Sequence, residues 1–307
     1  MKKDAILILC HDNFEQIRYF IQRTDFQYFD FYIHIDLKSN VFIDSFLKEF
    51  NNVYVIKNRV RVAWAKFSII QATLNLMESA TQSGCDYRYF HLMSGHCLPL
   101  KNSLELYHAF DGNSSVSREY IDSNPLPWSY WGSCFSQGLD RVRIYYPSFI
   151  VKTDPYWSVH YTYLYVRICR KFKLFRTKKK LAKIGPFFAG SEWFSLTQKT
   201  ILFMLDYLKK HPEFIKFFRN SFISDESFFQ TLIEKIPYSW EKMGNARYID
   251  WSAPACNSPN LLTKKDWPAM FDSNHFFARK ISMQANELKE FFDLLDDMNK
   301  HVSRLND

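Results

Sequence analysis

One complete strand–helix–strand unit can be read in residues 5–36, AILILCHDNFEQIRYFIQRTDFQYFDFYIHID. The apolar runs Ala5–Cys10 and Phe31–Ile35 are each typical of a buried strand. Between them, apolar residues recur every three to four positions over Phe14–Arg23, which predicts an amphipathic helix. A helix that connects two buried strands indicates that these strands lie parallel in one sheet.

The alternation of strands and helices continues along the chain of 307 residues. The pattern predicts helices at Val41–Phe50, Lys66–Gln82, Leu104–Phe110, Thr197–Lys210, Glu226–Lys235 and Ala285–Val302, and further strands at Val53–Ile56 and Tyr87–Met93. We therefore expect an α/β fold, with one large domain built on a Rossmann-like, mostly parallel mixed sheet flanked by helices.

The positive charge of the chain is concentrated in one segment. The formal net charge is +8, from 40 basic and 32 acidic residues, yet the stretch from Pro155 to Ser191 holds nine Lys and Arg and no Asp or Glu. The rest of the chain is close to neutral, so nucleic acid is not an expected partner. Residues 157–183 mix these cations with aromatic side chains, which suits an anionic membrane surface or a lipid-linked acceptor; a solvated basic helix, which is common, is the alternative.

Cysteine spacing and hydropathy indicate which cellular compartment suits the protein. The six cysteines lie far apart and form no C-x-x-C pair, which argues against a zinc module or a small disulfide scaffold and favours a reducing compartment. The apolar run Ala5–Cys10 is too short for a secretory leader, and no run is long enough to span a membrane. We expect a cytoplasmic protein that can lie peripherally on the inner face of the membrane.

Candidate binding residues follow the predicted strands, because ligands of open parallel sheets bind beyond the carboxyl ends of the strands. His11 follows the first strand and Asp36 follows the second. The Asp36 carboxylate could accept hydrogen bonds from a ribose or from the imide of uracil, or it could cap the next helix. Trp64 could stack on a flat base, or it could belong to the core.

The segment His91–Lys101 ends a strand with Ser94-Gly95 and offers no acidic pair for Mg²⁺ or Mn²⁺. His96 and Cys97 are adjacent, with no partners at ligand spacing, so we expect no metal site.

Charged and aromatic residues in the second half are candidates for catalysis. Glu226, in Ser224–Ile233, could remove a proton from a hydroxyl group. The alternative is a purely structural helix start, with Ser or Asp as the cap and Glu226 in the first turn. Glu192 and Trp193 form an acidic and aromatic pair suited to a sugar ring. Two cation pairs, Arg279-Lys280 and Lys264-Lys265, could stabilise a leaving diphosphate, or they could be solvated surface charges.

Taken together and in this order, several segments resemble the core-2/I-branching β-1,6-N-acetylglucosaminyltransferase family, which includes the peptide xylosyltransferases. The matching segments are the strand end at His11, IHIDLKS at 33–39, VAWA at 62–65, LMSG at 92–95 with PLK at 99–101, GSEWF at 190–194, SDESFF at 224–229, ARYIDW at 246–251 and FFARK at 276–280.

The resemblance implies a GT-A-like fold that transfers a sugar from a UDP-sugar, with inversion and without a metal cofactor. It implies Glu226 as the catalytic base, and donor binding by His11, Asp36, Trp64, Ser191, Lys264, Lys265, Arg279 and Lys280. It implies acceptor binding by Glu192, Trp193 and Trp251. The acceptor would be a glycan or a lipid-linked glycan, and the sugar would by family habit be GlcNAc, with xylose or glucose as options.

The same resemblance divides the chain into a nucleotide-sugar-binding half at 1–123, an acceptor and catalytic half at 124–284, and a C-terminal helix at 285–307. Two other functions remain open at this point. A glycoside hydrolase could use Glu192 and Glu226 as its carboxyl pair. A non-catalytic module could bind membranes or polyanions through the basic and aromatic segment.

Overall fold

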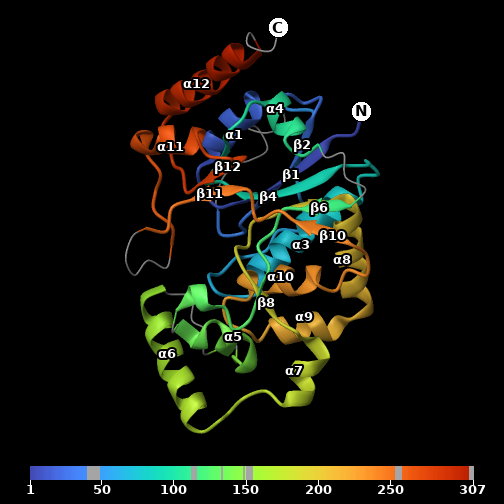
Figure 1. Ribbon diagram of the computed structural model, residues 1–307, viewed down its shortest axis with the longest axis vertical. Helices are drawn as coiled ribbons and strands as arrows, with labels where there is room; N and C mark the ends of the chain where they lie inside the picture. Colours follow the sequence, from blue (N-terminus) through green and yellow to red (C-terminus); the bar gives the residue numbers. More distant parts are fainter. Residues whose placement is uncertain are drawn as a thin grey trace.

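A five-stranded sheet forms the centre of the molecule, with strand order β3–β2–β1–β4–β9 (Figure 1). The computed structural model describes residues 1–39, 49–111, 116–132, 134–147, 149, 155–252 and 258–303. The strands of this sheet are β1 (Asp4–Cys10), β2 (Phe29–Ile35), β3 (Val53–Val55), β4 (Tyr89–Ser94) and β9 (Ser195–Thr197). Strands β1 to β4 are parallel, and β9 pairs antiparallel with β4. The prediction of an α/β fold with a mostly parallel mixed sheet is confirmed.

Both faces of the sheet are covered, which explains why β1 and β2 read as continuous apolar runs. Successive side chains of β1 point to opposite faces: Ala5, Leu7 and Leu9 join one core cluster, and Ile6, Ile8 and Cys10 join another. The first cluster is completed mainly by α3 (Ser68–Thr81), α8 (Gln198–Lys210), α9 (Pro212–Phe218) and α10 (Phe228–Ile233). The second is completed mainly by α1 (Phe14–Gln22), α4 (Ser103–His108), α11 (Trp267–Phe271) and α12 (Ala285–Ser303).

Residues 95–194, which connect β4 to β9, leave the central sheet, and we call this segment the excursion. It contains β5 (Cys97–Pro99), β6 (Ser117–Glu119), β7 (Asn124–Pro125), α5 (Leu139–Arg143), α6 (Pro155–Lys171), α7 (Lys178–Ile184) and β8 (Phe188–Ala189), with two short 3₁₀ turns, η1 (Ser129–Trp131) and η2 (Cys134–Ser136). Helices α5, α6 and α7 lie at the end of the molecule opposite α12 (Figure 1). The excursion therefore builds a second wall beside the sheet.

The chain after α8 returns to both parts of the molecule. The remaining elements are η3 (Ser224–Glu226), β10 (Trp240–Lys242), β11 (Arg247–Ile249), η4 (Lys264–Asp266) and β12 (Phe277–Arg279). Strand β12 lies between β11 and β5 in a three-stranded sheet, and β10 pairs with β6. Since β5 follows β4 by only a short turn, this pairing brings the segment that contains Arg279 to the carboxyl end of the main sheet.

Two predicted helices need comment. The helix predicted at Val41–Phe50 falls mainly on residues 40–48, which lie outside the described residues. The helix predicted at Glu226–Lys235 is interrupted: residues 224–226 form a 3₁₀ turn, Ser227 is non-helical, and α10 begins at Phe228. Neither turn nor helix has a side-chain cap, so the prediction that Ser or Asp caps a helix here is wrong.

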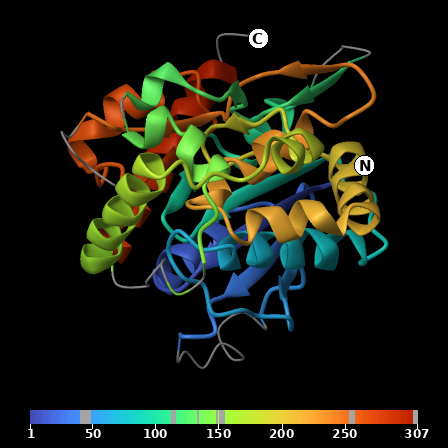
Figure 2. The same cartoon turned by 90° about the horizontal axis from the view of Figure 1, so that it is seen from below.

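Helix α6 lies on the outside of the molecule, away from the central strands (Figure 2). Its inner side packs in a small cluster through Val166 and Cys169, whereas Leu164 and Ile168 are exposed. Within the described part of the chain, no helix combines the length and the apolar character needed to cross a bilayer. Cys10, Cys85, Cys97 and Cys169 are free thiols.

Candidate active site

A cleft of about 1550 Å³ opens at the carboxyl ends of β1, β2 and β4 and extends to the wall formed by the excursion. Residues far apart in the sequence meet there, as expected for the carboxyl edge of an open sheet. Among the predicted site residues, those that line the cleft are His11, Asp36, Trp64, Ser191, Glu192, Trp193, Glu226, Trp251, Arg279 and Lys280. The structure thus brings together the predicted donor, acceptor and catalytic residues in one cavity.

Lys264 and Lys265 are not among the residues that line the cleft. Both begin the 3₁₀ turn η4, where Thr263 and Asp266 form a reciprocal capping box. Lys264 forms an ion pair with Glu290 on α12 and is exposed. The ion pair holds Lys264 at the C-terminal helix, and neither lysine lines the cleft, so the second cation pair that we expected there is not provided by these residues.

Asp36 is held at the end of β2 by donors on two sides. Its Oδ1 accepts the backbone N–H of Lys38 at 2.8 Å, and its Oδ2 accepts that of Val62 at 3.3 Å. The ammonium of Lys38 lies 3.5 Å from Oδ2. Asp36 therefore stabilises the turn that follows β2. A carboxylate can accept about four hydrogen bonds, so Asp36, which lines the cleft, can still accept hydrogen bonds from a ligand.

Trp64 projects an exposed indole into the cleft close to Asp36. It is 38% exposed, and its ring contacts Phe222 edge to face at 6.2 Å. The next residue, Ala65, has a left-handed backbone with φ of 60°. The edge contact leaves ring surface exposed, so the indole is available for stacking on a planar ligand.

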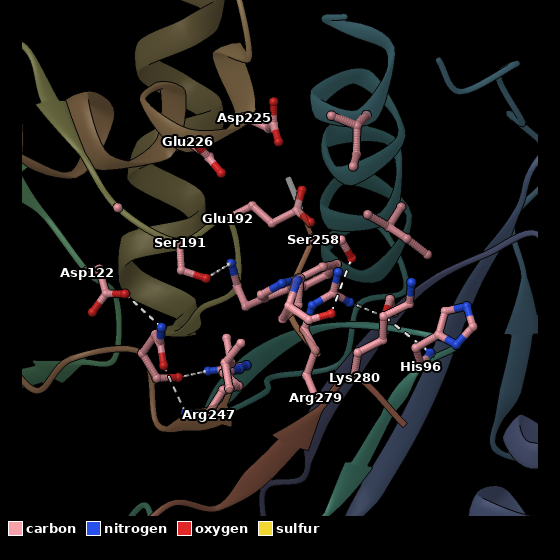
Figure 3. A pocket seen from close by; sticks show the side chains of 18 of the residues that line it. His96, Asp122, Ser191, Glu192, Asp225, Glu226, Arg247, Ser258, Arg279 and Lys280 are labelled. Carbon is pink, nitrogen blue, oxygen red and sulfur yellow. Dashed lines mark hydrogen bonds between the residues drawn. The ribbon is translucent and has the colours of Figure 1, made fainter. Parts of the chain in front are cut away.

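Arg279 and Lys280 emerge from the end of β12 on the same side of the cleft as His96 (Figure 3). Arg279 donates to Ser94 Oγ at 2.7 Å, and its guanidinium lies over the Trp193 ring at 4.4 Å. These contacts fix the Arg279 side chain between two segments that the sequence analysis singled out separately. Two adjacent cations here can stabilise an anionic group in the cleft.

Three carboxyl groups gather on the opposite wall, where Glu192 points toward Asp225 and Glu226 (Figure 3). Gly190 N–H donates to the Glu226 carbonyl at 3.0 Å, which joins the two segments. Only glycine fits at 190, because a Cβ there would lie 2.5 Å from the Asp122 Cβ.

Burial and crowding change the acidity of two of these groups. Burial, reinforced by the neighbouring Asp225 charge, raises the pKa of Glu192 to about 8. Burial and the charge of Glu226 raise the pKa of Asp225 to about 7. The cluster therefore holds protons near neutral pH, which is characteristic of sites that handle protons.

Arg141 was not identified from the sequence, yet it contacts the predicted base directly. Its Nη1 forms an ion pair with Glu226 Oε2, and its guanidinium lies over the Trp131 ring at 3.9 Å. The ion pair engages one oxygen of Glu226 and orients the carboxylate. Arg141 lies in the short helix α5, in a sequence, GLDRVR, that carries no motif for such a role.

Asp225 and Asp122 were also missed as members of the site. The sequence predicts only a capping role for Asp225, but its Oδ1 is buried and accepts no hydrogen bond from the described residues. Asp122 accepts a hydrogen bond from Asn245 at 2.7 Å, and burial raises its pKa. The sequence signal for Asp225 was its neighbour Glu226, whereas Asp122 had none.

Three non-glycine residues that line the cleft have a strained backbone. These residues are Ala65, Ile223 and Ala246, and each has a left-handed backbone, with φ of 60°, 45° and 57°. For the β-branched Ile223 this conformation is a genuine outlier. Such residues cost about 1–3 kcal/mol each and persist where the surrounding structure enforces them, often at functional sites.

Aromatic side chains form the outer rim of the cleft on the acidic side. Trp128 stacks on Tyr130 with ring centroids 5.0 Å apart and contacts Trp131 at 5.3 Å. Tyr130 and Trp251 are exposed and also line the cleft. Flat apolar surfaces beside carboxyl groups suit a sugar ring, which presents C–H groups on its faces and hydroxyls at its edge.

Comparison with known families places this architecture. The family model described as Core-2/I-Branching enzyme matches residues 8–130 and 150–298. The chain belongs to the Core-2/I-Branching enzyme family. The two matched segments contain every predicted site residue of this Core-2/I-Branching chain. Trp131 and Arg141, which also line the cleft, lie between the two segments.

Individual relatives are distant. The chain is 32% identical over 94 residues to a human β-1,3-galactosyl-O-glycosyl-glycoprotein β-1,6-N-acetylglucosaminyltransferase, covering 28% of this chain and 22% of the relative. It is 21% identical over 285 residues to a xylosyltransferase of Drosophila pseudoobscura pseudoobscura, covering 84% and 29%. It is 23% identical over 254 residues to a β-glucuronosyltransferase of Arabidopsis thaliana, covering 80% and 52%.

The alignments thus span about half or less of the length of these relatives. Among solved structures, mouse xyloside xylosyltransferase 1 aligns with 91% of this chain and 97% of its own, at 10% identity and a TM-score of 0.39.

Proposed function

We propose that the protein is an inverting glycosyltransferase that moves a sugar from a UDP-sugar to a hydroxyl group of a glycan or lipid-linked glycan. The observation that carries this proposal is the shared cleft, lined by Asp36, Glu226 and Lys280 from three distant parts of the sequence. Membership of the Core-2/I-Branching enzyme family and the transferase names of its relatives support the reaction class. GlcNAc is the sugar we propose first.

In the proposed complex, the nucleotide lies at the carboxyl edge of the sheet. Asp36 accepts hydrogen bonds from the uridine, and Trp64 stacks on the uracil ring, because both line the cleft and Val62, two residues before Trp64, donates its N–H to Asp36. His11 and Ser191 also line the cleft and contact the donor. Arg279 and Lys280 then face the diphosphate.

The proposed reaction is a single in-line displacement. Glu226 takes the proton from the acceptor hydroxyl, and the oxygen of that hydroxyl attacks the anomeric carbon of the donor. The bond between the anomeric carbon and the phosphate oxygen breaks, and UDP leaves from the opposite side with the bonding electrons. Configuration inverts. The ion pair with Arg141 uses Oε2 of Glu226, so Oε1 is the oxygen that we assign to the proton.

Fixed cations take the electrostatic role of a divalent metal in this proposal. The turn after β4 reads Ser94-Gly95-His96-Cys97, with no acidic pair to hold Mg²⁺ or Mn²⁺ against the diphosphate. Arg279 is oriented by Ser94 and by the face of Trp193. Positive groups fixed in advance can stabilise the charge that develops on the leaving phosphate.

A donor panel tests the proposal. Purified protein is heated with UDP, UDP-GlcNAc, UDP-xylose and UDP-glucose, each with and without EDTA, and UDP release is followed in parallel. We expect UDP and one UDP-sugar to raise the melting temperature, with no effect of EDTA on binding or turnover. A strict requirement for Mn²⁺ would remove the metal-independent mechanism, and failure of every uridine ligand to bind would remove the donor assignment.

Helix α6 supports a peripheral membrane location for the acceptor. Tyr161, Leu164 and Ile168 follow one another at helical spacing and are 48%, 54% and 42% exposed. Arg167 and Lys171 are exposed beside them, and α7 adds exposed Lys178 to Lys180. An apolar stripe flanked by cations suits the surface of an anionic bilayer, and we place the protein on the cytoplasmic face of the membrane.

Vesicle sedimentation tests this surface. We expect binding to vesicles rich in phosphatidylglycerol, little binding to phosphatidylcholine, and release at high salt. Substituting Leu164 and Ile168 by serine should weaken binding, whereas Leu202→Ser, at a similarly exposed leucine on α8, should not. Equal binding of both variants would show that α6 is only a solvated helix.

A further inference from the structure

Three potential metal ligands meet where β1 and β4 end. One ligand atom from each of His11, Asp12 and His96 lies within 4.8 Å of the others. The Nε2 atoms of His11 and His96 are 3.3 and 3.2 Å from the two carboxylate oxygens of Asp12. Around an ion with metal–ligand bonds of about 2.0–2.2 Å, tetrahedral ligands are about 3.4 Å apart, so the two spacings between a histidine nitrogen and a carboxylate oxygen are close to those of a loaded site.

The backbone fixes this arrangement. Gly95 approaches β1 so closely that a Cβ would lie 3.2 Å from the Asp12 carbonyl oxygen and 3.3 Å from the Cys10 Cβ. Gly95 N–H also donates to the Leu9 carbonyl at 3.0 Å. The close approach holds His96 against the segment His11-Asp12.

Contacts at Nδ1 orient the His96 ring, as is usual for metal-binding histidines, whose second ring nitrogen is held by the protein. Its Nδ1 faces the protein, 3.2 Å from the Ile281 carbonyl and 2.6 Å from the Asn13 side-chain amide, so Nε2 is directed at Asp12. Asp12 Oδ1 is shielded from water and accepts no hydrogen bond from the described residues. This oxygen therefore has unused capacity that a cation could satisfy.

We propose that His11, Asp12 and His96 form a site for Zn²⁺ within the cleft. Two imidazoles and one carboxylate favour Zn²⁺ over Mg²⁺ or Ca²⁺, which prefer oxygen ligands. Three protein ligands leave a coordination position for water or for an anionic ligand. The positive charges of Lys280 and Arg279 act on His96 and oppose the ion, which favours exchangeable rather than permanent binding. The site shares His11 with the proposed donor site, but the proposal does not require sugar transfer, because the three ligands meet whether or not a donor is bound.

Competition with a chromophoric zinc chelator tests the site in the full-length protein, after removal of metals and without nucleotide. We expect one equivalent of Zn²⁺ to bind and a large excess of Mg²⁺ not to displace it. Asp12→Asn and His96→Ala should each weaken binding by at least about 100-fold, the upper range for loss of a partner that only orients a metal ligand.

The matched control is His108→Ala, which removes a histidine paired with a carboxylate, Asp111, on the outer surface at 2.6 Å. Its Zn²⁺ affinity should equal that of the wild type. Melting temperatures identify any variant that fails to fold, and Asp12→Asn, which nearly preserves shape, then decides alone. Absence of stoichiometric Zn²⁺ binding, or equal affinity in Asp12→Asn and wild type, overturns the proposal. Failure to bind UDP would leave it intact, because no nucleotide enters the measurement.

Discussion

The carboxylate of Asp36 and the carboxyl groups of the opposite wall are held in contrasting ways. Asp36 receives two backbone N–H groups and lies near the Lys38 ammonium. Glu192 and Asp225 face other carboxyl groups, and crowding and burial raise the pKa of each. A charge that is satisfied in advance suits recognition of a ligand, whereas charges left unsatisfied suit proton transfer. Under the proposed function, this contrast distinguishes a binding end of the cleft, at Asp36, from a reactive end, at Glu192 and Asp225.

The largest expected effect is at the reactive end. Glu226→Gln should lower turnover by about 10²–10⁴-fold, the usual contribution of a general base, because the amide cannot accept the proton of the acceptor hydroxyl. UDP affinity, measured by calorimetry, should stay close to that of the wild type. Glu241→Gln, at an exposed residue paired with Arg118, is the matched control and should keep full turnover. Near-normal turnover in Glu226→Gln would show that another group is the base.

A smaller effect is expected at the binding end. Asp36→Asn should weaken UDP binding by about 10–100-fold, because hydrogen bonds to a charged group contribute about 1.5–3 kcal/mol. Turnover at saturating donor should change much less. Inorganic pyrophosphate, which lacks the uridine, serves as the internal control, and its affinity should not change. If pyrophosphate and UDP lost affinity equally, Asp36 would act on the whole cleft rather than on the nucleoside.

The smallest effect is on stability, and its sign follows from the raised pKa of Glu192. The folded protein keeps a proton on Glu192 up to about pH 8, whereas the unfolded chain releases it near pH 4.5. Stability should therefore fall as pH rises through this window. Glu192→Gln removes this loss, so the variant should match the wild type at pH 5 and exceed it by a few kcal/mol at pH 9, since each unit of raised pKa contributes about 1.4 kcal/mol.

Urea unfolding at the two pH values measures this difference. Glu213→Gln provides a control of opposite sign, because hydrogen bonding lowers the pKa of Glu213, and that variant should gain nothing at high pH. A Glu192→Gln variant that is equally stabilised at both pH values would mean that packing, rather than ionisation, sets the difference.

The sequence predicted the binding end of the cleft better than the reactive end. His11, Asp36 and the Ser94-Gly95 turn follow apolar strands, and the geometry of a parallel sheet brings such residues to one edge. Arg141 and Asp122 come from the excursion, where short turns carry no periodicity, so their approach to Glu226 and Asn245 depends on tertiary packing. Lys264 illustrates the opposite error, a predicted donor-binding residue that lies outside the cleft. It forms an ion pair with Glu290 on the C-terminal helix instead.

Strands β4 and β9 are neighbours in the main sheet although 100 residues, 95–194, separate Ser94 from Ser195. Both ends of the excursion are consequently anchored in neighbouring strands of the central sheet. Under the proposed function, divergence within the excursion can then alter which molecule receives the sugar, while the end of the cleft proposed for the nucleotide keeps its shape. Such anchoring offers one physical route by which a single scaffold could acquire many specificities. The excursion is therefore the segment to exchange between relatives in chimeras.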